Sequence, residues 1–400
     1  MSNCNITNKK LKRFMSFGKM PLANGFLKKK DFKKEKFYKL NVGFNEKISL
    51  FQVLDLPKFS NIIYKDYPFF THKSKYMIKH FKDCADWLKK NFLDHNSNLI
   101  EIGSNDGTML KNFKNTNVNV LGIDPSPNVA AYARRNGVKT YDIFFNSKNL
   151  NKLKKYHNNT KVIFAANVFC HIKDLVDVIK CVDKLLSQDG YFIFEEPYLG
   201  SMYKNVSYDQ LYDEHIYMFS ISSILKIFDI YDFQLIDAIP QNTHGGSIRY
   251  IISRKSKTGN IKKISKLLKY EDTKNISNLD GCLEFKKNCE ISKHELLKKI
   301  NRLKNDNKNI CGYGATAKST TVLNYCNIGN DLIDCIFDTS KEKIGKFSPG
   351  MHIPIVSMDN FHKSNFDLSY LFAWNHKNEI FEKEKKYKKN GGKWLCHVKI

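Results

Sequence analysis

The sequence lacks the cysteine spacing of a metal ribbon or a disulfide scaffold. Its ten cysteines are scattered from Cys4 to Cys396, and no two of them form a Cys-x-x-Cys pair. We therefore expect free thiols in a reducing compartment. No apolar run approaches the roughly 18 residues of a membrane helix, and the N-terminus has no apolar signal-peptide core. These absences predict a cytoplasmic protein with no membrane partner.

Acidic residues are scarce relative to basic ones. The chain has 40 Asp and Glu against 66 Lys and Arg, which gives a formal net charge of +26. Such a charge attracts polyanions. The lysines are nevertheless spread along the whole chain and are not gathered in one arm, which is typical of compositional drift. We expect no nucleic-acid partner, and a small anionic substrate such as a nucleotide diphosphate would use the same field.

Length and patterning predict several domains. A chain of 400 residues with 42% hydrophobic residues can bury more than one core. Short apolar strands alternate with helical segments in the middle of the chain, which predicts a parallel sheet covered by helices and ending in an antiparallel pair. Leucines at helical spacing follow, and then a second, shorter α/β pattern. The predicted boundaries are 1–62, 63–255, 256–306 and 307–400.

The first strand of the middle region runs into a glycine turn. EIGSNDGTML gives Glu101-x-Gly103-x-x-x-Gly107, and the next strand ends at Asp124. Glycines there let the backbone approach a ligand closely. An acid about twenty residues further on can accept both hydroxyls of a ribose. The spacing differs from the Gly-x-Gly-x-x-Gly of dinucleotide enzymes, and it favours one nucleoside, as in S-adenosylmethionine.

A second glycine turn, GYGATAKSTT, opens the last region. It is followed by Lys318, Ser319 and Thr320, but the spacing is not that of a P-loop. Backbone amides at a helix start together with one lysine can hold a diphosphate. The alternative is a tight turn with a solvated lysine.

Taken in order, these stretches resemble one family, the S-adenosylmethionine-dependent sugar C-methyltransferases that act on nucleotide-linked 4-keto deoxysugars. The resemblance covers nearly the whole chain and is carried by GKMPLANGF, EIGSNDGTML, GIDPSPNVA, NVFCHI, YDEHIYMFS, HGGSIRY, GYGATAKSTT, PGMHIPI and AWNHKNEI. It implies a small N-terminal zinc module, a central Rossmann-like class I methyltransferase domain and a C-terminal Rossmann-like α/β domain that helps to hold the nucleotide sugar. We expect a monomer or homodimer.

The N-terminal module departs from the family pattern of two Cys-x-x-Cys pairs. Cys4 is present, but Thr7, Asn45 and Ile48 stand at the other three positions. One thiolate cannot hold a tetrahedral zinc ion. We predict no metal, and a module held by the packing of apolar side chains, namely Phe14, Phe17, Leu22, Phe26 and Phe51.

The resemblance implies a catalytic group around the Tyr-x-Glu-His motif. His215 would be the general base that removes the proton next to the ketone, since its unperturbed pKa of roughly 6.5 lies near working pH. Glu214 would orient the His215 ring, and Tyr212 would bind substrate or assist proton transfer. Asn167 and His171, from an Asn-x-x-x-His element, would donate hydrogen bonds to the enolate oxygen.

Further residues are assigned to the two ligands on the same resemblance. The expected cofactor contacts are Glu101, Gly103, Ser104, Asp106, Gly107, Asp124, Pro125 and Asn167. The expected substrate contacts are Tyr67, His244, Ser247, Arg249, Tyr313, Lys318 and Ser319.

Two other functions stay open on the sequence. The charge of +26 allows a nucleic-acid methyltransferase, although no Asn-Pro-Pro-Tyr signature is present. The replaced zinc positions allow a non-catalytic binding protein of the same fold, against which stand the intact Tyr212, His215, Asn167 and His171.

Overall fold

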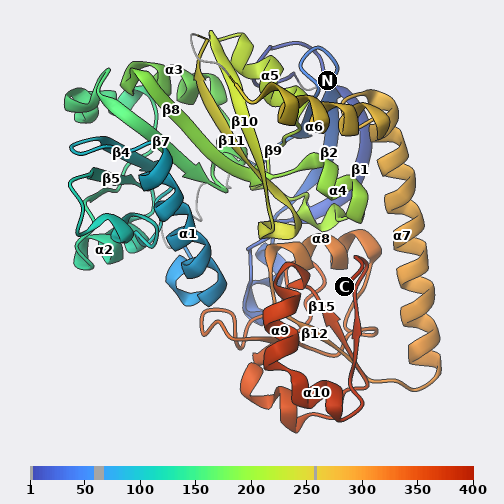
Figure 1. Cartoon of the computed structure of the whole chain (residues 1–400). Coiled ribbons are helices and arrows are strands. Elements are labelled where there is room, and N and C mark those ends of the chain that lie inside the picture. The colour runs from blue at the N-terminus through green and yellow to red at the C-terminus, as the bar shows by residue number, and fades with distance from the viewer. Residues whose placement is uncertain (1–2, 58–66, 256–258) are drawn as a thin grey trace.

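A computed structural model describes residues 3–57, 67–255 and 259–400, and Figure 1 shows their arrangement. Three sheets organise the chain: a four-stranded N-terminal sheet, a seven-stranded central sheet and a five-stranded C-terminal sheet. The predicted boundary at residue 62 lies outside the described residues. None of the described helices is both long and apolar enough to cross a membrane.

The N-terminal sheet is antiparallel and takes its last strand from the middle of the chain. Its order is β1 (Lys12–Pro21), β2 (Phe37–Asn45), β3 (Leu50–Leu54) and β9 (Tyr217–Met218). Phe14, Phe17 and Phe51 are buried in one apolar cluster with Phe26 packed against it, whereas Leu22 is partly buried outside it. Because β9 follows His215 directly, this sheet is joined to the predicted catalytic motif.

The four positions that correspond to zinc ligands in the family lie together without forming a thiolate set. Asn45 Nδ2 donates a hydrogen bond of 2.8 Å to Thr7 Oγ1. Asn45 Oδ1 accepts from the backbone N–H groups of Lys47 and Ile48. The Cys4 and Ile48 side chains are both buried in one apolar cluster. A hydrogen bond and apolar packing therefore connect the two loops here.

The central sheet has the strand order β10-β11-β8-β7-β4-β5-β6, and β11 alone runs opposite to the other six strands. Its strands are β4 (Asn98–Ile102), β5 (Asn119–Ile123), β6 (Thr140–Tyr141), β7 (Thr160–Ala166), β8 (Leu186–Pro197), β10 (Phe233–Gln241) and β11 (Ser247–Arg254). The predicted antiparallel pair at the end of this region is confirmed. The predicted Rossmann-like class is confirmed as well, since a mixed sheet of this order with helices on both faces is doubly wound.

Alternate residues of the central strands face opposite layers. Leu99 packs with Phe81 and Leu88 of α1, whereas Ile100 packs on the other face with helices α3 and α5. This two-residue period follows from the strand geometry, and it buries both faces of the sheet. The helices are α1 (Lys75–Asn91), α2 (Pro127–Arg135), α3 (Leu175–Leu185), α4 (Leu199–Asn205) and α5 (Ile221–Asp229).

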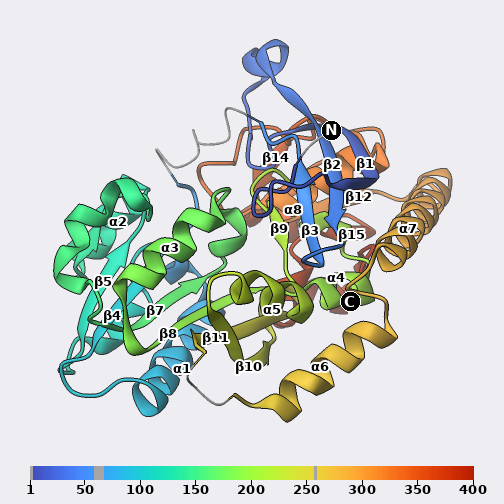
Figure 2. The same ribbon diagram turned by 90° about the horizontal axis from the view of Figure 1, so that it is seen from above.

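Two helices lead from the central sheet to the C-terminal one, as the helical spacing predicts. They are α6 (Ile261–Thr273) and α7 (Leu279–Asn305), and α7 runs beside β1 down to the C-terminal sheet (Figures 1 and 2). That sheet is fully parallel, in the order β14-β13-β12-β15-β16. Its elements are β12 (Ile310–Tyr313), α8 (Ala317–Cys326), β13 (Ile336–Asp338), β14 (Ile355–Ser357), β15 (Leu368–Leu371), α9 (Lys377–Lys383), α10 (Lys385–Lys389) and β16 (Lys393–Leu395).

Candidate active site

A single cavity of about 1080 Å³ joins the carboxyl ends of the central and C-terminal strands. Its central wall follows β4, β5 and β7, and its other wall is built by residues 316–318, 338–343 and 375–376. Asn24 and Leu56 of the N-terminal part close one side. Ligands of doubly wound sheets bind outside the carboxyl ends of the strands, where the strand order reverses. A pocket for one ligand is typically about 300–1,000 Å³, and this cavity lies just above the upper end of that range.

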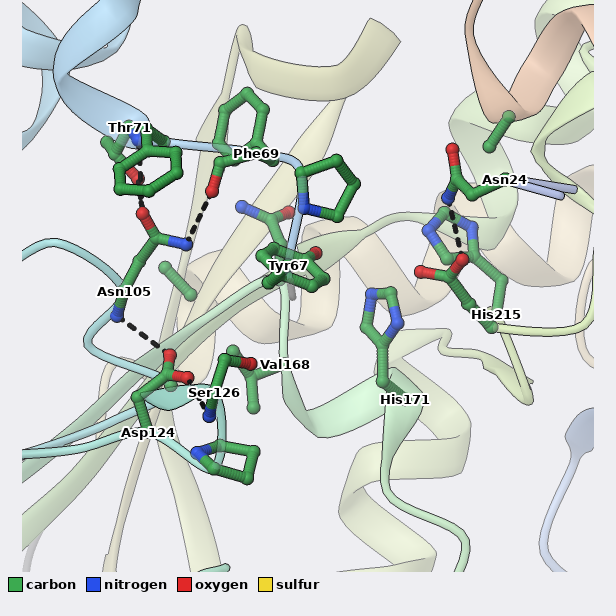
Figure 3. A pocket seen from close by; sticks show the side chains of 18 of the residues that line it. Asn24, Tyr67, Phe69, Thr71, Asn105, Asp124, Ser126, Val168, His171 and His215 are labelled. Atoms are coloured by element: carbon green, nitrogen blue, oxygen red, sulfur yellow. Dashed lines mark hydrogen bonds between the residues drawn. The ribbon is translucent and has the colours of Figure 1, made fainter. Parts of the chain in front are cut away.

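The glycine turn after β4 is held in place by an acid at the end of β5. Gly103 has φ +66°, and its N–H donates to the Ile123 carbonyl oxygen. The Asp124 carboxylate accepts from the backbone N–H groups of Asn105 and Ser126, both at 2.9 Å, as Figure 3 shows. A Cβ on residue 103 would come within 2.2 Å of Val168 Cγ2. Only glycine allows this close approach of the turns that follow β4 and β7.

The glycine turn after β12 has the same local geometry. Gly314 has φ +85° and donates its N–H to the Phe337 carbonyl oxygen. The Asp338 carboxylate accepts from the N–H groups of Ala315 and Ser340, both at 2.7 Å. Each of the two α/β sheets thus places an acid beside its glycine turn in the same cavity: Asp124 from the central sheet and Asp338 from the C-terminal sheet.

The turn between β7 and η6 (Phe169–His171) is fixed by the buried Glu196 carboxylate and by the backbone carbonyl of Glu195. Glu196 Oε1 accepts from the three backbone N–H groups of residues 168–170. Asn167 has a left-handed backbone with φ +56° and donates its N–H to the Glu195 carbonyl oxygen. Both Asn167 and His171 line the cavity, as the sequence predicts.

His215 and Tyr212 form a hydrogen-bonded pair in the cavity wall. His215 Nδ1 lies 2.7 Å from the Gln210 carbonyl oxygen, so Nδ1 carries the proton. Nε2, 2.7 Å from the Tyr212 hydroxyl, then accepts from it. Burial, together with the neighbouring His171 ring, lowers the pKa of His215 well below its ordinary value. The imidazole is therefore neutral, with its lone pair on Nε2.

The contact expected between Glu214 and the His215 ring is absent, and this prediction is wrong. Glu214 Oε1 accepts from Asn24 Nδ2 at 2.6 Å, and Asp213 accepts from the backbone N–H of Ala23. The Gln210 carbonyl orients the His215 ring in its place. Burial and the nearby Asp213 raise the pKa of Glu214 to about 7. Consecutive residues here point to different partners because the segment is a tight turn before β9.

Several imidazoles and the Lys318 amine line the cavity. Burial lowers the pKa of His171 and of His376 to about 4, and that of His244 well below its ordinary value. Burial also lowers the pKa of Lys318, near the start of α8. Figure 3 shows His171 between Tyr67 and His215. The wall therefore offers neutral N–H donors and the amine of Lys318, besides the other lining lysines Lys73, Lys173, Lys341 and Lys343.

Most predicted ligand residues line the cavity and six do not. Glu101, Gly103, Ser104, Asp124, Pro125, Asn167, Tyr67, His244 and Lys318 line it. Six residues that were predicted to contact the cofactor or the substrate lie outside the cavity lining, namely Asp106, Gly107, Ser247, Arg249, Tyr313 and Ser319. Their side chains already have partners within the fold, and Gly107 packs against Val138.

Two family models match the chain. One describes a methyltransferase domain and matches residues 76–238, and the other describes a C-methyltransferase C-terminal domain and matches residues 242–398. The C-methyltransferase NovU of Streptomyces niveus is 28% identical over 387 residues, which are 96% of this chain and 92% of that protein. The chain belongs to the S-adenosylmethionine-dependent C-methyltransferases.

Solved methyltransferases resemble part of this C-methyltransferase. Magnesium protoporphyrin IX methyltransferase from Synechocystis PCC 6803, solved with bound SAM, is 13% identical with a TM-score of 0.33, over 44% of this chain and 79% of that chain. A SAM-dependent methyltransferase from Thermotoga maritima, a possible histamine N-methyltransferase, is 15% identical with a TM-score of 0.36, over 48% of this chain and 97% of that chain.

The cofactor of the C-methyltransferase, S-adenosylmethionine, fits the polar atoms around the first glycine turn. Glu101 Oε2, Ser104 Oγ and Asn167 Oδ1 are buried and have no hydrogen-bond partner within the described residues. Burial, reinforced by Asp106, raises the pKa of Glu101. A ligand with an ammonium group and ribose hydroxyls would satisfy these atoms and Asp124. When bound, the cofactor supplies an electrophilic methyl group on sulfur.

One group of side chains in the C-methyltransferase has metal-ligating atoms close together, but it fits a metal poorly. The atoms of Cys170, His171 and His215 lie within 4.8 Å of one another. Both His215 nitrogens are already occupied by Gln210 and Tyr212. Burial, followed by Glu196, raises the pKa of Cys170 well above its ordinary value, whereas metal binding needs a thiolate.

Sequence reasoning missed four cavity contributors. Asn24 and His376 stand in GKMPLANGF and AWNHKNEI, stretches that carried the resemblance but from which no site residue was predicted, and the Gln210 contribution is a backbone carbonyl that no residue pattern reveals. Asp338 had a signal. It ends the strand after the second glycine turn, at about the spacing that identified Asp124 after the first.

Proposed function

We propose that this C-methyltransferase methylates a carbon next to the ketone of a nucleotide-linked 4-keto deoxysugar. The support comes from the cavity, whose lining includes Asp124 beside the first glycine turn, Asp338 beside the second, and the Tyr212–His215 pair. The first turn suits the cofactor, and the second, with Asp338 and Lys318, suits the nucleotide diphosphate of the substrate. The sugar would then lie beside the imidazoles.

Carbon methylation requires removal of a proton from the carbon that accepts the methyl group. The Tyr212–His215 pair takes up this proton, which ends on His215 Nε2. The Gln210 carbonyl then stabilises the imidazolium because it accepts the Nδ1 proton. Because the Tyr212 hydroxyl already contacts Nε2 at 2.7 Å, it either relays the proton or binds the sugar.

The negative charge that develops on the ketone oxygen needs donors already in place. His171 is neutral at working pH, since burial lowers its pKa to about 4, and it can donate one N–H. Asn167 is fixed by the left-handed backbone and the Glu195 carbonyl. Because both lie in a turn held by Glu196, they need little reorganisation as charge develops.

The decisive experiment incubates the protein with methyl-labelled S-adenosylmethionine and nucleotide-linked sugars that do or do not carry a 4-keto group. We expect label on carbon, only with keto sugars, and exchange of the adjacent hydrogen with solvent. His215→Gln should abolish both while cofactor binding persists, and His294→Gln, an exposed histidine on α7, should change neither. Solvent exchange that persists in His215→Gln would exclude His215 as the base. Label on oxygen or nitrogen would exclude carbon methylation.

A further inference from the structure

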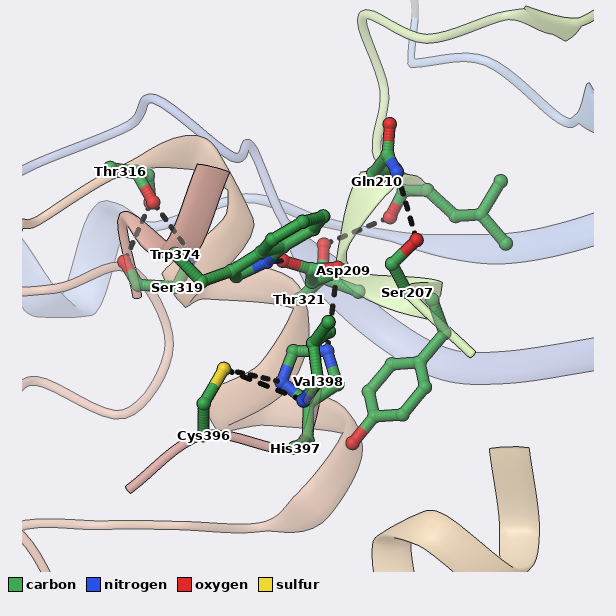
Figure 4. Close-up of polar contacts among 12 residues, drawn as sticks. Ser207, Asp209, Gln210, Thr316, Ser319, Thr321, Trp374, Cys396, His397 and Val398 are labelled. Carbon is green, nitrogen blue, oxygen red and sulfur yellow. Dashed lines mark hydrogen bonds and ion pairs between the residues drawn. The ribbon is translucent and has the colours of Figure 1, made fainter. Parts of the chain in front are cut away.

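A buried polar cluster joins the segment that precedes Tyr212 to the C-terminal α/β part of the chain (Figure 4). Its members are Asp209 in η7 (Tyr208–Gln210), Trp374 in η10 (Trp374–His376) and His397 after β16. The Asp209 and His397 side chains are each 1% exposed. None of the three lines the cavity. The proposed chemistry therefore does not use this cluster directly.

Asp209 receives both partners from the C-terminal sheet. Trp374 Nε1 donates to Asp209 Oδ2 at 2.6 Å. His397 Nε2 lies 3.4 Å from Asp209 Oδ1, and His397 Nδ1 lies 2.8 Å from the Tyr370 hydroxyl. Burial lowers the pKa of His397, but Asp209 outweighs this and raises it to about 10. The cluster therefore holds a buried ion pair together with a charge-assisted hydrogen bond.

Such a cluster adds little stability for its size. Desolvation of a buried ion pair often costs as much as the attraction returns, and an apolar core of equal volume would be at least as stable. Buried polar groups do fix one arrangement of the segments that carry them, because a shifted segment leaves charges unpaired. The segments joined here decide what that arrangement controls.

The segments of Asp209 and Trp374 continue into the cavity wall, at Tyr212 and at Asn375 and His376. Gln210 follows Asp209, and its carbonyl holds the Nδ1 proton of His215. His376 of η10 lines the cavity. A Cβ on Gly245 would come within 2.1 Å of the Trp374 ring, and the preceding residue, His244, lines the cavity. The Asp209 charge also opposes the effect of burial on the pKa of Lys318.

We propose that Asp209, Trp374 and His397 are positioning residues that lock the Gln210 carbonyl in place and so fix the tautomer of His215. Through them the C-terminal sheet, which is proposed to hold the nucleotide, sets the geometry of the base. The catalytic consequence rests on the proposed function of His215. The structural consequence is that only one nitrogen of the His215 ring carries a proton, and it does not depend on the proposed function.

The first test measures the tautomer without substrate. Protein labelled with ¹⁵N-histidine is compared by NMR with His215→Gln, which identifies the His215 signals. We expect a protonated Nδ1 and an unprotonated Nε2 in the parent, and a mixture of tautomers in Asp209→Ala and Trp374→Phe. His215 signals that are identical in the folded variants and the parent would overturn the proposal.

The second test measures catalysis with the labelled cofactor and a keto-sugar substrate. Trp374→Phe removes one N–H but keeps a ring against Gly245, so it should fold. We expect kcat to fall by up to about 100-fold, the loss typical of a misplaced catalytic group, with unchanged cofactor affinity. Asp209→Asn, which keeps an oxygen for the indole, should recover part of the loss seen in Asp209→Ala.

The control removes a similar hydrogen bond elsewhere in the same sheet. The Tyr387 hydroxyl donates to the Lys393 carbonyl oxygen, and Tyr387→Phe should lower the melting temperature with kcat unchanged. If Trp374→Phe behaves like this control, the cluster is only structural and the proposal fails. If the parent transfers no methyl group to any keto sugar, the proposed function fails, and the NMR comparison still decides the role of the cluster.

Discussion

Substitution of Gly103 tests the glycine turn that holds the cofactor. An alanine Cβ would come within 2.2 Å of Val168 Cγ2 and within 3.1 Å of Val168 Cβ, in a backbone with φ +66°. The left-handed backbone costs about 1–2 kcal/mol for a residue with a Cβ. Overpacking adds typically about 1–3 kcal/mol. Gly103→Ala should therefore lower the free energy of unfolding by about 2–5 kcal/mol.

The clash also reaches the cofactor site, because Val168 lies between Asn167 and the η6 turn. In the free variant the η6 turn can shift away from the new methyl group. If S-adenosylmethionine binds only when this turn is in its original position, the overpacking cost is subtracted from the binding free energy. A cost of about 1–3 kcal/mol corresponds to a loss of about 5- to 150-fold in affinity for S-adenosylmethionine. Titration calorimetry and chemical denaturation measure the two quantities on the same protein.

Gly137 provides a matched control. It has φ +81°, but a Cβ there would have no neighbour within 4 Å. Gly137→Ala should therefore show the backbone cost of about 1–2 kcal/mol alone, with unchanged cofactor affinity. The reasoning is refuted if Gly103→Ala binds S-adenosylmethionine as tightly as the parent does, or if both variants lose the same stability.

Three further changes have defined outcomes. Because the pKa of Glu214 is raised to about 7, its favourable contribution to the free energy of unfolding is present at low pH and is lost as pH rises through 7. In denaturant titrations, Glu214→Gln should therefore have a free energy of unfolding up to about 3 kcal/mol above that of the parent at pH 8, but not at pH 4. Asn45→Ala should lose about 1–3 kcal/mol of stability in denaturant titrations, because it removes the hydrogen bond to Thr7. A chelator should leave the parent's melting curve unchanged. Stoichiometric zinc in the purified protein would contradict the prediction that the N-terminal module holds no metal. Lys318→Met should raise the KM for a nucleotide sugar at least about 10-fold without weakening cofactor binding; an unchanged KM would remove Lys318 from the diphosphate site.

The strands and the first glycine turn could be predicted because their signals are local. The apolar stretches around Leu99, Leu121 and Ile163 are short and bounded by turn residues, which is typical of buried parallel strands. Strand β1 was not predicted, since its residues alternate irregularly and its pattern of burial is interrupted by register shifts against β2.

The assignments that failed share a physical reason. Asp106, Arg249 and Ser319 are polar residues in the right motifs, but the fold satisfies them internally: Asp106 holds His72 and Thr108, Arg249 pairs with Glu195, and Ser319 bonds to Thr316. A motif fixes which residue stands at a position. It does not fix whether its side chain points into the cavity or into the fold.

By itself the sequence determined the doubly wound central sheet, the glycine turn with its acid at Asp124, and the presence of Tyr212 and His215 three residues apart. Those features depend on the conformational preferences of neighbouring residues and on strand periodicity. Only the tertiary structure decided that a backbone carbonyl at Gln210 sets the His215 tautomer, and that Trp374 and His397 hold that segment from another sheet. These contacts join residues far apart in the chain, and their geometry depends on how whole sheets pack together.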